Sequence, residues 1–410
     1  MDHFNYVIVG GGIAGVTAAE TIRQNDPNGT IAIISDEPYF LYSRVMLSKP
    51  NFFLGKIPFD QVWLKTEQWY KDNKINYLGG KTAIRFDSAS KKINLSDNTS
   101  IGYDKLLLAV GVNVRTLHIP GSDKKGIHYL RTLDDGKAIM EHIKTAKKAV
   151  VIGGGFIGFE MADLLKLAGM DTTMLLREHH FWDPTLDEGS AGMIERAMTD
   201  GGIKILKNAE IAEILGAENI QEIKLKDGTT IECDMLMCGI GVVNNIEWIS
   251  KSGVTTGKGI LANEYLETNI PDVYTAGDIA EYKDLLLEEN TQMGNWVNGR
   301  EQGRIAGLNM TGKHEAFRFV SFYTTQGFGV TIAFVGDVAP GADRTIIARG
   351  SPELKSYMRI LVAHNEIEGA TMINRTGEMS TIAKLIEKNI NVSDKLKELA
   401  DPNFSLKSLL

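Results

Sequence analysis

The sequence predicts an α/β protein that is built from two Rossmann-like domains and a smaller α+β domain. Two copies of a glycine-rich turn carry this prediction, because each copy lies between an apolar, β-branched run and a helical pattern. From Phe317 onward, aromatic and β-branched runs replace this alternation, which indicates an antiparallel sheet in the third domain.

The two turns are copies of the motif G-x-G-x-x-G. Their glycines are Gly10, Gly12 and Gly15 in the first copy, and Gly153, Gly155 and Gly158 in the second. In this motif the first glycine permits a tight turn, the second lets the backbone approach a pyrophosphate, and the third lets the helix pack on the strand. Two copies predict two dinucleotides, one in each domain. The alternative is one cofactor site and a decayed structural repeat.

Acidic residues follow the second strand of the first domain. A helix predicted over residues 13–23 leads to a strand over residues 30–35, and Asp36 and Glu37 come directly after it. An acid about 20 positions past the fingerprint is where a ribose hydroxyl binds. Asp36 is the first choice for this role and Glu37 is the alternative.

Other polar residues are candidates for ligand contacts. Arg44 could hold a pyrophosphate and Lys49 could favour a reduced, anionic flavin, although each alone is more often a surface charge. Asp278 follows an apolar strand and a tight glycine, so it could accept a ligand hydroxyl, cap the next helix, or do both.

The duplication extends beyond the turns. Residues 225–234 parallel residues 95–104, and each stretch then enters an apolar strand that ends in glycine. The second unit therefore lies inside the sequence of the first domain. The expected domains are residues 1–113 with 243–316, residues 114–242, and residues 317–410.

The later part of the chain contains one long helix and a mixed C-terminal domain. The helix is rich in small residues and is predicted over residues 296–310. In the C-terminal domain, strands are predicted over residues 319–323 and 329–335, followed by a hairpin over residues 357–370 and helices from Met379.

The composition is that of a globular protein. The chain has 410 residues and a formal net charge of −8, without a basic run that would suggest nucleic acid. No apolar stretch approaches the length of a membrane span, and the first strand starts too early to leave room for a signal peptide. Two cysteines, Cys233 and Cys238, fit a reducing setting. We therefore expect a cytoplasmic protein that binds neither nucleic acid nor membrane, and no metal site.

With these pieces placed, the chain resembles the FAD-dependent pyridine-nucleotide oxidoreductases. Within them it is most similar to the rubredoxin/ferredoxin reductase branch, which is related to the nitrite reductase flavin module and the apoptosis-inducing flavoprotein. The resemblance runs essentially from end to end. Besides the double fingerprint it rests on Tyr42-x-Arg44, Leu47-Ser48-Lys49, Ala109-Val110-Gly111, Leu130-Arg131-Thr132, Gly158-Phe159-Glu160 and Ala276-Gly277-Asp278.

The resemblance implies two Rossmann-like domains of the glutathione reductase type, with FAD in the first domain and NAD(P)H in the inserted one. On the FAD side it implies contacts from Gly10, Gly12, Ala14, Gly15, Asp36, Glu37, Arg44, Lys49, Thr82, Ala109, Gly111, Arg131, Gly277, Asp278 and Trp296. On the nicotinamide side it implies contacts from Gly153, Gly155, Phe156, Ile157, Gly158, Glu160, Arg177, Glu178, Gly241 and Tyr323.

Lys49 and Glu160 are the candidate catalytic residues that the resemblance implies. Lys49 would lie near the flavin ring, and Glu160 would lie where nicotinamide meets flavin. The alternative for Glu160 is a first-turn carboxylate that complements the helix dipole. The matching position in the first repeat is Thr17, so the fold does not require an acid there.

The sequence departs from the family pattern at two places. Tyr323 stands where related reductases often carry tryptophan over the flavin. Val242-Val243-Asn244 replaces the usual Arg-Pro after the last strand of the inserted domain, which concerns the domain hinge and not the fold.

The cysteine positions favour flavin-only chemistry. Cys233 and Cys238 match neither redox-pair position of the related disulfide reductases, and residues 39–43 lack the cysteine of the peroxide- and oxygen-reducing relatives. The first hypothesis is therefore an NAD(P)H-dependent reductase, monomeric or homodimeric, that passes electrons to rubredoxin or ferredoxin without a redox disulfide. The alternatives are an NAD(P)H oxidase or diaphorase, and a flavoprotein that signals through its redox state.

The choice between NADH and NADPH depends on residues after the second strand of the inserted domain. Glu178 could accept the ribose 2′-hydroxyl of NADH, whereas Arg177 could pair with the 2′-phosphate of NADPH. Alignment with the family places Leu176 at the usual ribose-binding position, so NADH is favoured only slightly.

Overall fold

The computed structural model describes residues 2–410, which form two compact units. The first unit comprises residues 2–43, 60–113 and 242–321, and the second comprises residues 44–59, 114–241 and 322–410. This grouping puts the inserted segment and the C-terminal residues in one unit. The three-domain bounds given above stay a prediction.

The first unit is built around one mixed sheet. Its elements are β1 (His3–Val9), α1 (Ile13–Asn25), β2 (Ile31–Ser35), η2 (Phe59–Val62), α3 (Glu67–Asp72), β3 (Ile75–Gly79), β4 (Ala83–Asp87), β5 (Lys92–Leu95), β6 (Ser100–Leu108), β7 (Asn113–Val114), β16 (Val242–Val243), α7 (Glu247–Ser250), β17 (Ile260–Ala262), β18 (Val273–Thr275), β19 (Ala280–Lys283), β20 (Asn290–Thr291) and α8 (Trp296–Met310). The strand order is β3-β2-β1-β6-β5-β4, and β18 pairs with β6. A smaller sheet has the order β17-β19-β20.

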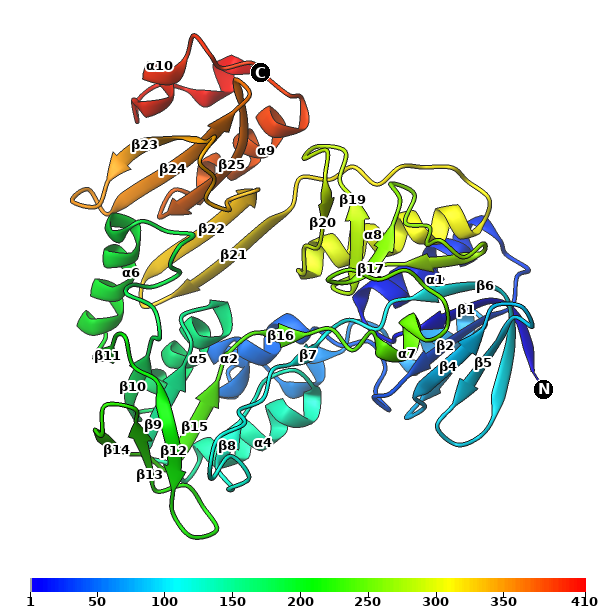
Figure 1. Cartoon of the computed structure of the whole chain (residues 1–410), viewed down its shortest axis with the longest axis horizontal. Coiled ribbons are helices and arrows are strands. Elements are labelled where there is room, and N and C mark those ends of the chain that lie inside the picture. Colours follow the sequence, from blue (N-terminus) through cyan, green and yellow to red (C-terminus); the bar gives the residue numbers. More distant parts are fainter. Residues whose placement is uncertain (1) are drawn as a thin grey trace. The chain divides into compact units, whose positions relative to one another are not determined.

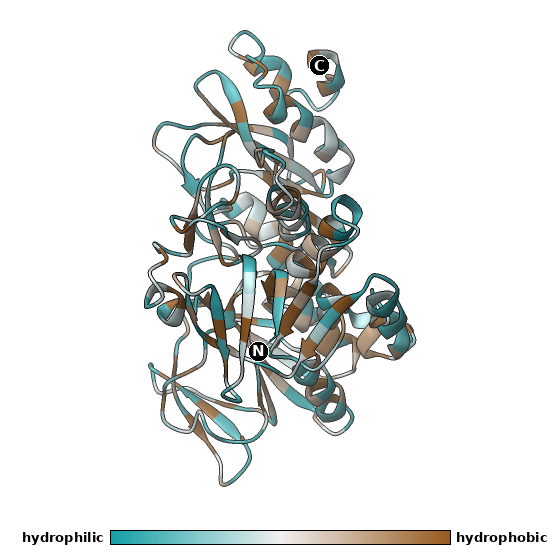
Figure 2. Cartoon of the chain, turned by 90° about the vertical axis from the view of Figure 1, so that its right-hand side faces the viewer, coloured by the Kyte–Doolittle hydropathy of each residue, from teal (hydrophilic) through white to brown (hydrophobic). Residues whose placement is uncertain are grey.

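The strands at the centre of this sheet are apolar because both of their faces are covered. β2 has the sequence Ile-Ala-Ile-Ile-Ser and is buried along its whole length, as expected for a central parallel strand. Figure 2 shows apolar residues along the strands and hydrophilic residues along the connecting loops. The parallel strands β1, β2 and β6 end on the same side, where the first glycine turn follows β1.

Helices α1 and α8 pack closely because glycines leave room for the backbone (Figure 1). A Cβ atom on Gly303 would lie 2.2 Å from the carbonyl oxygen of Ala14, and one on Gly307 would lie 2.8 Å from that of Ala18. A side chain at either position would therefore push the helices apart. The bounds of α8 confirm the helix that its small residues predicted.

The second unit contains a parallel sheet of the same plan. Its elements before the C-terminal region are η1 (Arg44–Ser48), α2 (Pro50–Phe53), β8 (Ile127–His128), α4 (Leu133–Ile143), β9 (Lys148–Ile152), α5 (Phe156–Leu167), β10 (Asp171–Leu175), α6 (Glu188–Asp200), β11 (Lys204–Leu206), β12 (Ile211–Leu215), β13 (Glu222–Leu225), β14 (Thr230–Glu232) and β15 (Met235–Cys238). The order β11-β10-β9-β15-β8 matches β3-β2-β1-β6-β18 of the first unit. The predicted fold, two Rossmann-like domains and an α+β domain, is confirmed.

The C-terminal region adds an antiparallel sheet with helices. Its elements are β21 (Phe322–Gly327), β22 (Val330–Gly336), β23 (Thr345–Ser351), β24 (Ser356–Ala363), β25 (Glu366–Ile373), η3 (Thr376–Glu378), α9 (Met379–Glu387), α10 (Leu396–Ala400) and η4 (Leu406–Leu409). The strand order is β21-β22-β25-β24-β23, and α9 packs on β22 and β25. The hairpin predicted over residues 357–370 is confirmed by β24 and β25.

The first strand of the C-terminal sheet starts later than the sequence pattern predicts. β21 starts at Phe322, three residues later than predicted, because the preceding residues belong to the first unit, where Phe317 is buried and Ser321 accepts a hydrogen bond from Asn295. Among residues 2–410, no helix combines the length and the hydropathy that crossing a bilayer requires.

Candidate functional site

The first glycine turn forms a cradle in which side chains are excluded. Gly10 has φ of +127°, and a Cβ atom there would lie 2.1 Å from the carbonyl oxygen of Ala109. A Cβ on Gly15 would lie 2.0 Å from the carbonyl oxygen of Gly10, whereas no atom lies within 4 Å of a Cβ on Gly12. The first and third glycines are therefore required by packing, and the second faces open space.

The second glycine turn repeats this geometry. Gly153 has φ of +102°, and its Cβ would lie 2.3 Å from the carbonyl oxygen of Gly239. A Cβ on Gly158 would lie 1.9 Å from the carbonyl oxygen of Gly153, and Gly155 again faces open space. The two turns are thus equivalent in structure as well as in sequence.

Each open glycine is the N-cap of a long helix. Gly12 precedes α1 and Gly155 precedes α5, and neither helix receives a side-chain hydrogen bond at its cap. The backbone N–H groups of the first turn, including those of Ala14 and Ile157, therefore remain available for an anion, and the helix dipole favours negative charge there. Both cradles fit the pyrophosphate of a dinucleotide.

The structure separates the two candidate ribose carboxylates. Asp36 follows β2 directly and is exposed, and one of its oxygens accepts a hydrogen bond from the backbone N–H of Glu37 at 3.0 Å. Glu37 accepts a hydrogen bond from the Tyr42 hydroxyl at 2.7 Å. Because the Asp36 carboxylate is exposed at the end of β2, whereas the Glu37 carboxylate binds the Tyr42 hydroxyl, Asp36 stays the first choice.

The remaining residues expected on the FAD side within the first unit lie on three segments. Ala109 is buried at the end of β6, Gly111 follows with φ of +65°, and Thr82 is exposed before β4. Trp296 is the first residue of α8 and is partly exposed.

Gly277 and Asp278 form a turn between β18 and β19. Gly277 has φ of +84°, and its Cβ would lie 3.1 Å from that of Ala14 at the start of α1. The element after Asp278 is strand β19, and α8 is capped by Asn295, which accepts a hydrogen bond from the N–H of Asn298. The interpretation of Asp278 as a helix cap was wrong, because the next segment pairs as a strand. The ligand-binding interpretation stays a prediction.

One residue that positions this turn was not predicted. The Gln302 side chain is fully buried on α8, and its oxygen accepts a hydrogen bond from the Gly277 N–H at 2.6 Å. Its amide nitrogen has no hydrogen-bond partner among the described residues. Gln302 lies 25 residues from Gly277 in the sequence, and nothing in a helix rich in small residues signals this contact.

Lys49 and Glu160 form an ion pair in the second unit. Glu160 is 2% exposed, and the Lys49 ammonium donates to its Oε1 atom. Ser48 donates to Oε2, and Thr325 donates to Oε1 at 2.6 Å. The carboxylate therefore has three donors from the 44–59 segment and from β21.

The position of Glu160 rules out the alternative given for it. Glu160 is the fifth residue of α5, beyond the first turn, and its carboxylate is used by side chains rather than by backbone N–H groups. A helix-dipole role requires the first turn. A buried acid at this place is instead matched to a cation and two hydroxyl groups.

Arg44 and Arg131 also meet in the second unit. The Arg44 guanidinium donates to the carbonyl oxygen of Arg131. The N–H of Arg131 donates to Asp135 at 2.9 Å, within the capping box that starts α4 at Thr132. The two arginines expected on the FAD side are thus brought together, and their role stays a prediction.

Tyr323 of β21 packs on Phe156, the first residue of α5. Their ring centroids are 3.7 Å apart. Trp182, which the sequence did not single out, lies against Phe156 at 4.8 Å and against Phe334 of β22 at 5.5 Å. The aromatic side chains join the C-terminal sheet to the start of the second fingerprint helix.

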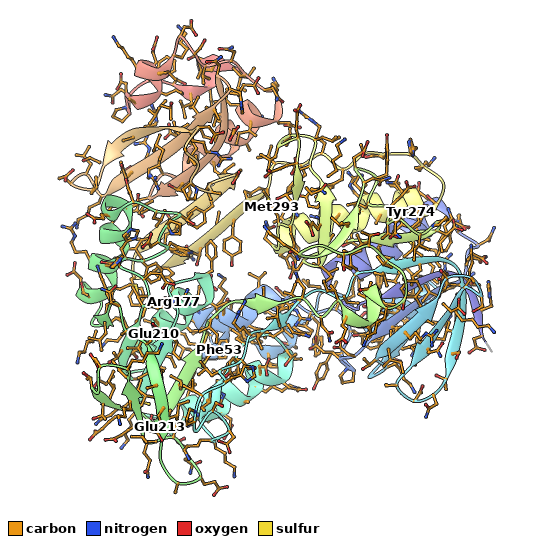
Figure 3. The ribbon with its side chains drawn as sticks, in the orientation of Figure 1. Phe53, Arg177, Glu210, Glu213, Tyr274 and Met293 are labelled. Carbon is orange, nitrogen blue, oxygen red and sulfur yellow. The ribbon has the colours of Figure 1, made fainter. Side chains whose placement is uncertain are left out.

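The residues that could select the nucleotide lie on the surface after β10. The Arg177 side chain is 74% exposed and pairs with Glu178 at 3.1 Å. Figure 3 shows Arg177 close to Glu210. The pKa of Glu210 is lowered first by its hydrogen bond from Lys226 and only last by the charge of Arg177. Leu176 is buried.

Gly241 follows β15 with φ of +93°, and its carbonyl oxygen accepts a hydrogen bond from the N–H of Arg115.

Cys233 and Cys238 are free thiols in an apolar cluster around β15. Burial raises the pKa of both thiols to about 12. Since the thiolate is the reactive form of cysteine, these groups are poorly suited to redox chemistry.

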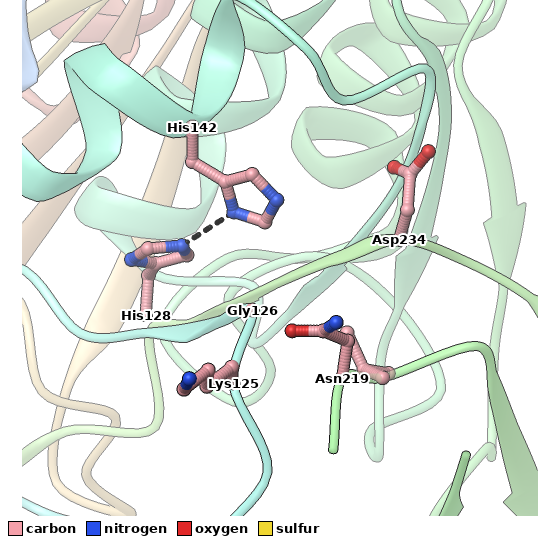
Figure 4. Close-up of a pocket in the computed structure, with 7 residues that line it drawn as sticks. Lys125, Gly126, His128, His142, Asn219 and Asp234 are labelled. Atoms are coloured by element: carbon pink, nitrogen blue, oxygen red, sulfur yellow. Dashed lines mark hydrogen bonds between the residues drawn. The ribbon is translucent and has the colours of Figure 1, made fainter. Parts of the chain in front are cut away.

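A separate pocket of about 470 Å³ lies at the other end of the second parallel sheet (Figure 4). Its lining includes Gly126 and Asp234, which precede β8 and β15, and a pair of histidines. The fingerprint turn follows the carboxyl end of β9, where dinucleotides bind in such sheets. The pocket therefore does not belong to the nucleotide site.

Two family models cover nearly the whole chain. The model described as pyridine nucleotide-disulphide oxidoreductase matches residues 4–303, and a reductase C-terminal model matches residues 322–410. The chain belongs to the pyridine nucleotide-disulphide oxidoreductase family. As a member of this family it is an FAD-dependent NAD(P)H oxidoreductase, and the two cradles described above fit its two dinucleotides.

Similar proteins include a rhodocoxin reductase and a putidaredoxin reductase. Rhodocoxin reductase of Rhodococcus erythropolis is 29% identical over 408 residues, which are 98% of this chain and 93% of that protein. The covalent putidaredoxin reductase–putidaredoxin complex has a TM-score of 0.93 at 25% identity, covering 100% of this chain and 98% of the other.

A longer relative matches the chain over about half of its own length. Nitrite reductase [NAD(P)H] of Bacillus subtilis (strain 168) is 29% identical over 394 residues. These residues are 95% of this chain but only 48% of the nitrite reductase. The chain thus spans about half of the length of that enzyme.

Proposed function

We propose that this oxidoreductase takes electrons from NAD(P)H and delivers them, through FAD, to a small one-electron carrier of the ferredoxin or rubredoxin class. The observation that carries the proposal is the buried Glu160 carboxylate with its Lys49 partner, one helical turn from the second cradle. The similarity to rhodocoxin reductase and to putidaredoxin reductase supports the choice of acceptor.

FAD, when bound, accepts a pair of electrons from the nicotinamide and can release them one at a time. The chain supplies binding and electrostatics. The cradles at Gly10 and Gly153 would hold the two pyrophosphates, and Lys49 would supply positive charge to the bound flavin. Glu160 fixes the position of the Lys49 ammonium, which donates a hydrogen bond to its Oε1 atom.

The Glu160 site needs no cysteine relay. Cys233 and Cys238 are buried in the core of the second unit, and burial raises their pKa to about 12. A one-electron protein carrier needs only brief docking through a small interface, so a persistent complex is not required. Such carriers are usually acidic, and local Lys and Arg side chains would attract them even though the chain has a net charge of −8.

Stopped-flow mixing tests the acceptor. Protein reduced with NADH is mixed with oxidised ferredoxin, rubredoxin, or air-saturated buffer over a series of salt concentrations. We expect transfer to at least one carrier to exceed reoxidation by oxygen, and its rate to fall as salt rises. Transfer to every carrier that is no faster than reoxidation by air would favour the oxidase hypothesis instead.

A further inference from the structure

Strand β21 lies along helix α5 with its side chains in register with the helical turns. Tyr323 contacts Phe156 at 3.7 Å between ring centroids, and Thr325 donates to Glu160 at 2.6 Å. Two residues of a strand span about 6.6 Å, and four residues of a helix span about 6 Å, so alternate strand residues meet successive turns.

The register continues for one more turn. The N–H of Phe328 donates to Asp163 at 3.1 Å, and a Cβ on Gly327 would lie 2.9 Å from the Phe159 ring. The absence of a side chain at Gly327 therefore lets β21 approach α5 closely. This approach brings the Thr325 hydroxyl to the Glu160 carboxylate.

The Thr325 hydroxyl and the Lys49 ammonium share the same carboxylate oxygen. Both donate to Oε1 of Glu160, while Ser48 donates to Oε2. Thr325 is 4% exposed and Ser48 is 5% exposed, so water has little access to this group. The hydroxyl groups fix the plane of the carboxylate, and the plane sets where the ammonium lies.

A neutral donor suits this place because other acidic groups are near. Burial, together with the Glu160 charge, raises the pKa of Asp163. Burial and the same charge raise the pKa of Tyr323. A further acid at position 325 would add negative charge to a site that water does not screen. Threonine supplies a hydrogen bond without charge.

We infer that Thr325, contributed by the C-terminal sheet, is a positioning residue for the Lys49–Glu160 pair. Its hydroxyl holds the Glu160 carboxylate in the orientation in which Oε1 faces Lys49. The inference rests on the proposed function insofar as the pair acts in flavin reduction. Thr325 itself is not a catalytic residue, because it acts only through Glu160.

The first test reads the carboxylate directly in the oxidised, FAD-loaded, full-length protein. Glutamate is labelled with carbon-13 at the side-chain carboxyl, and the resonance of Glu160 is assigned by its loss in Glu160→Gln. We expect the resonance to move in Thr325→Val and to return in Thr325→Ser. Thr324→Val is the matched control, since Thr324 is exposed on the same strand. A resonance that stays in place in Thr325→Val would overturn the inference.

The second test reads flavin reduction by NADH in anaerobic stopped flow. We expect the limiting rate to fall by about tenfold in Thr325→Val, as for loss of one hydrogen bond to a charged group, with the dissociation constant of NADH unchanged. Thr325→Ser should restore most of the rate. If Glu160→Gln reduces flavin as fast as the native protein, the role of the pair in the proposed function is wrong, while the carboxyl resonance still decides the position of Thr325.

Discussion

The Lys49 ammonium reaches the Glu160 carboxylate across 111 residues of sequence, and the pair is completed by hydroxyl groups from two further positions. Lys49 lies at the N-cap of the short helix α2, and Glu160 lies inside α5. The pair therefore joins the 44–59 segment to the fingerprint helix of the second unit. Its energetics can be measured separately from catalysis.

Breaking this pair on one side should destabilise the protein more than removing it altogether. Lys49→Met leaves a buried carboxylate without its cation, which costs about 3 kcal/mol of unfolding free energy, whereas Lys49→Met combined with Glu160→Gln should recover much of that loss. Urea denaturation of Lys49→Met, Glu160→Gln and the double variant gives the three losses, and Lys56→Met, an exposed lysine of the same segment, is the control. A loss in the double variant that equals the sum of the two single losses would show that the two side chains do not interact.

Gln302→Leu should weaken FAD binding. The change removes the acceptor of the Gly277 N–H and leaves that buried group unpaired, at a cost of roughly 1–3 kcal/mol in the turn before Asp278. The dissociation constant for FAD, followed by flavin fluorescence, should rise by about tenfold. Gln68→Leu, on the surface of α3, should leave it unchanged. A Gln302→Leu protein that retains FAD as tightly as Gln68→Leu would contradict the role given to this residue.

Replacing both cysteines should spare flavin reduction. Cys233→Ala with Cys238→Ala removes two buried side chains, so stability should fall by about 1–2 kcal/mol while the rate of reduction by NADH stays within twofold. In anaerobic titration the native protein should be fully reduced by about two electrons, the capacity of one flavin. Uptake of four electrons would show a redox disulfide.

Acid should destabilise the second unit through a histidine pair. Nε2 of His128 lies 2.7 Å from Nδ1 of His142 (Figure 4). Burial, then the charge of His142, lower the pKa of His128 from 6.5 to about 4, against a smaller opposing effect of Asp135. The unfolded chain therefore binds more protons between these values, so this contribution to stability is present above pH 6.5 and is lost as the pH falls toward 4.

The size of this effect is roughly 1.4 kcal/mol for each pH unit of the window. Urea denaturation across the window should show a steeper loss for the native protein than for His128→Phe. His364→Gln should behave like the native protein, because the His364 side chain is 82% exposed. Parallel pH profiles for native and His128→Phe proteins would assign the acid sensitivity to other groups.

Arg177→Ala distinguishes the two nucleotides. The Arg177 side chain is 74% exposed and its neighbour Glu178 is 34% exposed, so either can reach a ribose substituent. If NADH is the substrate, Arg177→Ala should change kcat/KM for NADH by less than twofold, while Glu178→Ala should lower it by about tenfold. A loss of NADPH use in Arg177→Ala that spares NADH use would identify phosphate recognition instead.

The parts of the fold set by local sequence could be predicted. The glycine turns, α8 and the β24–β25 hairpin depend on motif spacing and on local patterning, and each was found where it was expected. The start of β21 and the cap proposed for Asp278 were wrong, because the pairing of neighbouring strands decided them. Local pattern does not encode such pairing.

The candidate site was predictable only in part. Lys49 and Glu160 were named from family motifs, and the structure brings them together. Thr325, Ser48 and Gln302 were not named as site residues, because a hydroxyl or amide becomes functional only when packing sets it against a distant partner. The interval of two residues between Tyr323 and Thr325 was the available signal, since both lie on one face of a strand.

The equivalence of the two glycine cradles has a consequence for how the protein tells its cofactors apart. In each cradle the first and third glycines meet a carbonyl oxygen at nearly the same distance, and the second faces open space. Each turn can therefore bind a diphosphate, but it does not distinguish the groups that the diphosphate links. Discrimination must therefore reside in the flanking positions, where Thr17 in one repeat corresponds to Glu160 in the other. Exchanging the two turns alone should leave the dinucleotide specificity of each domain unchanged.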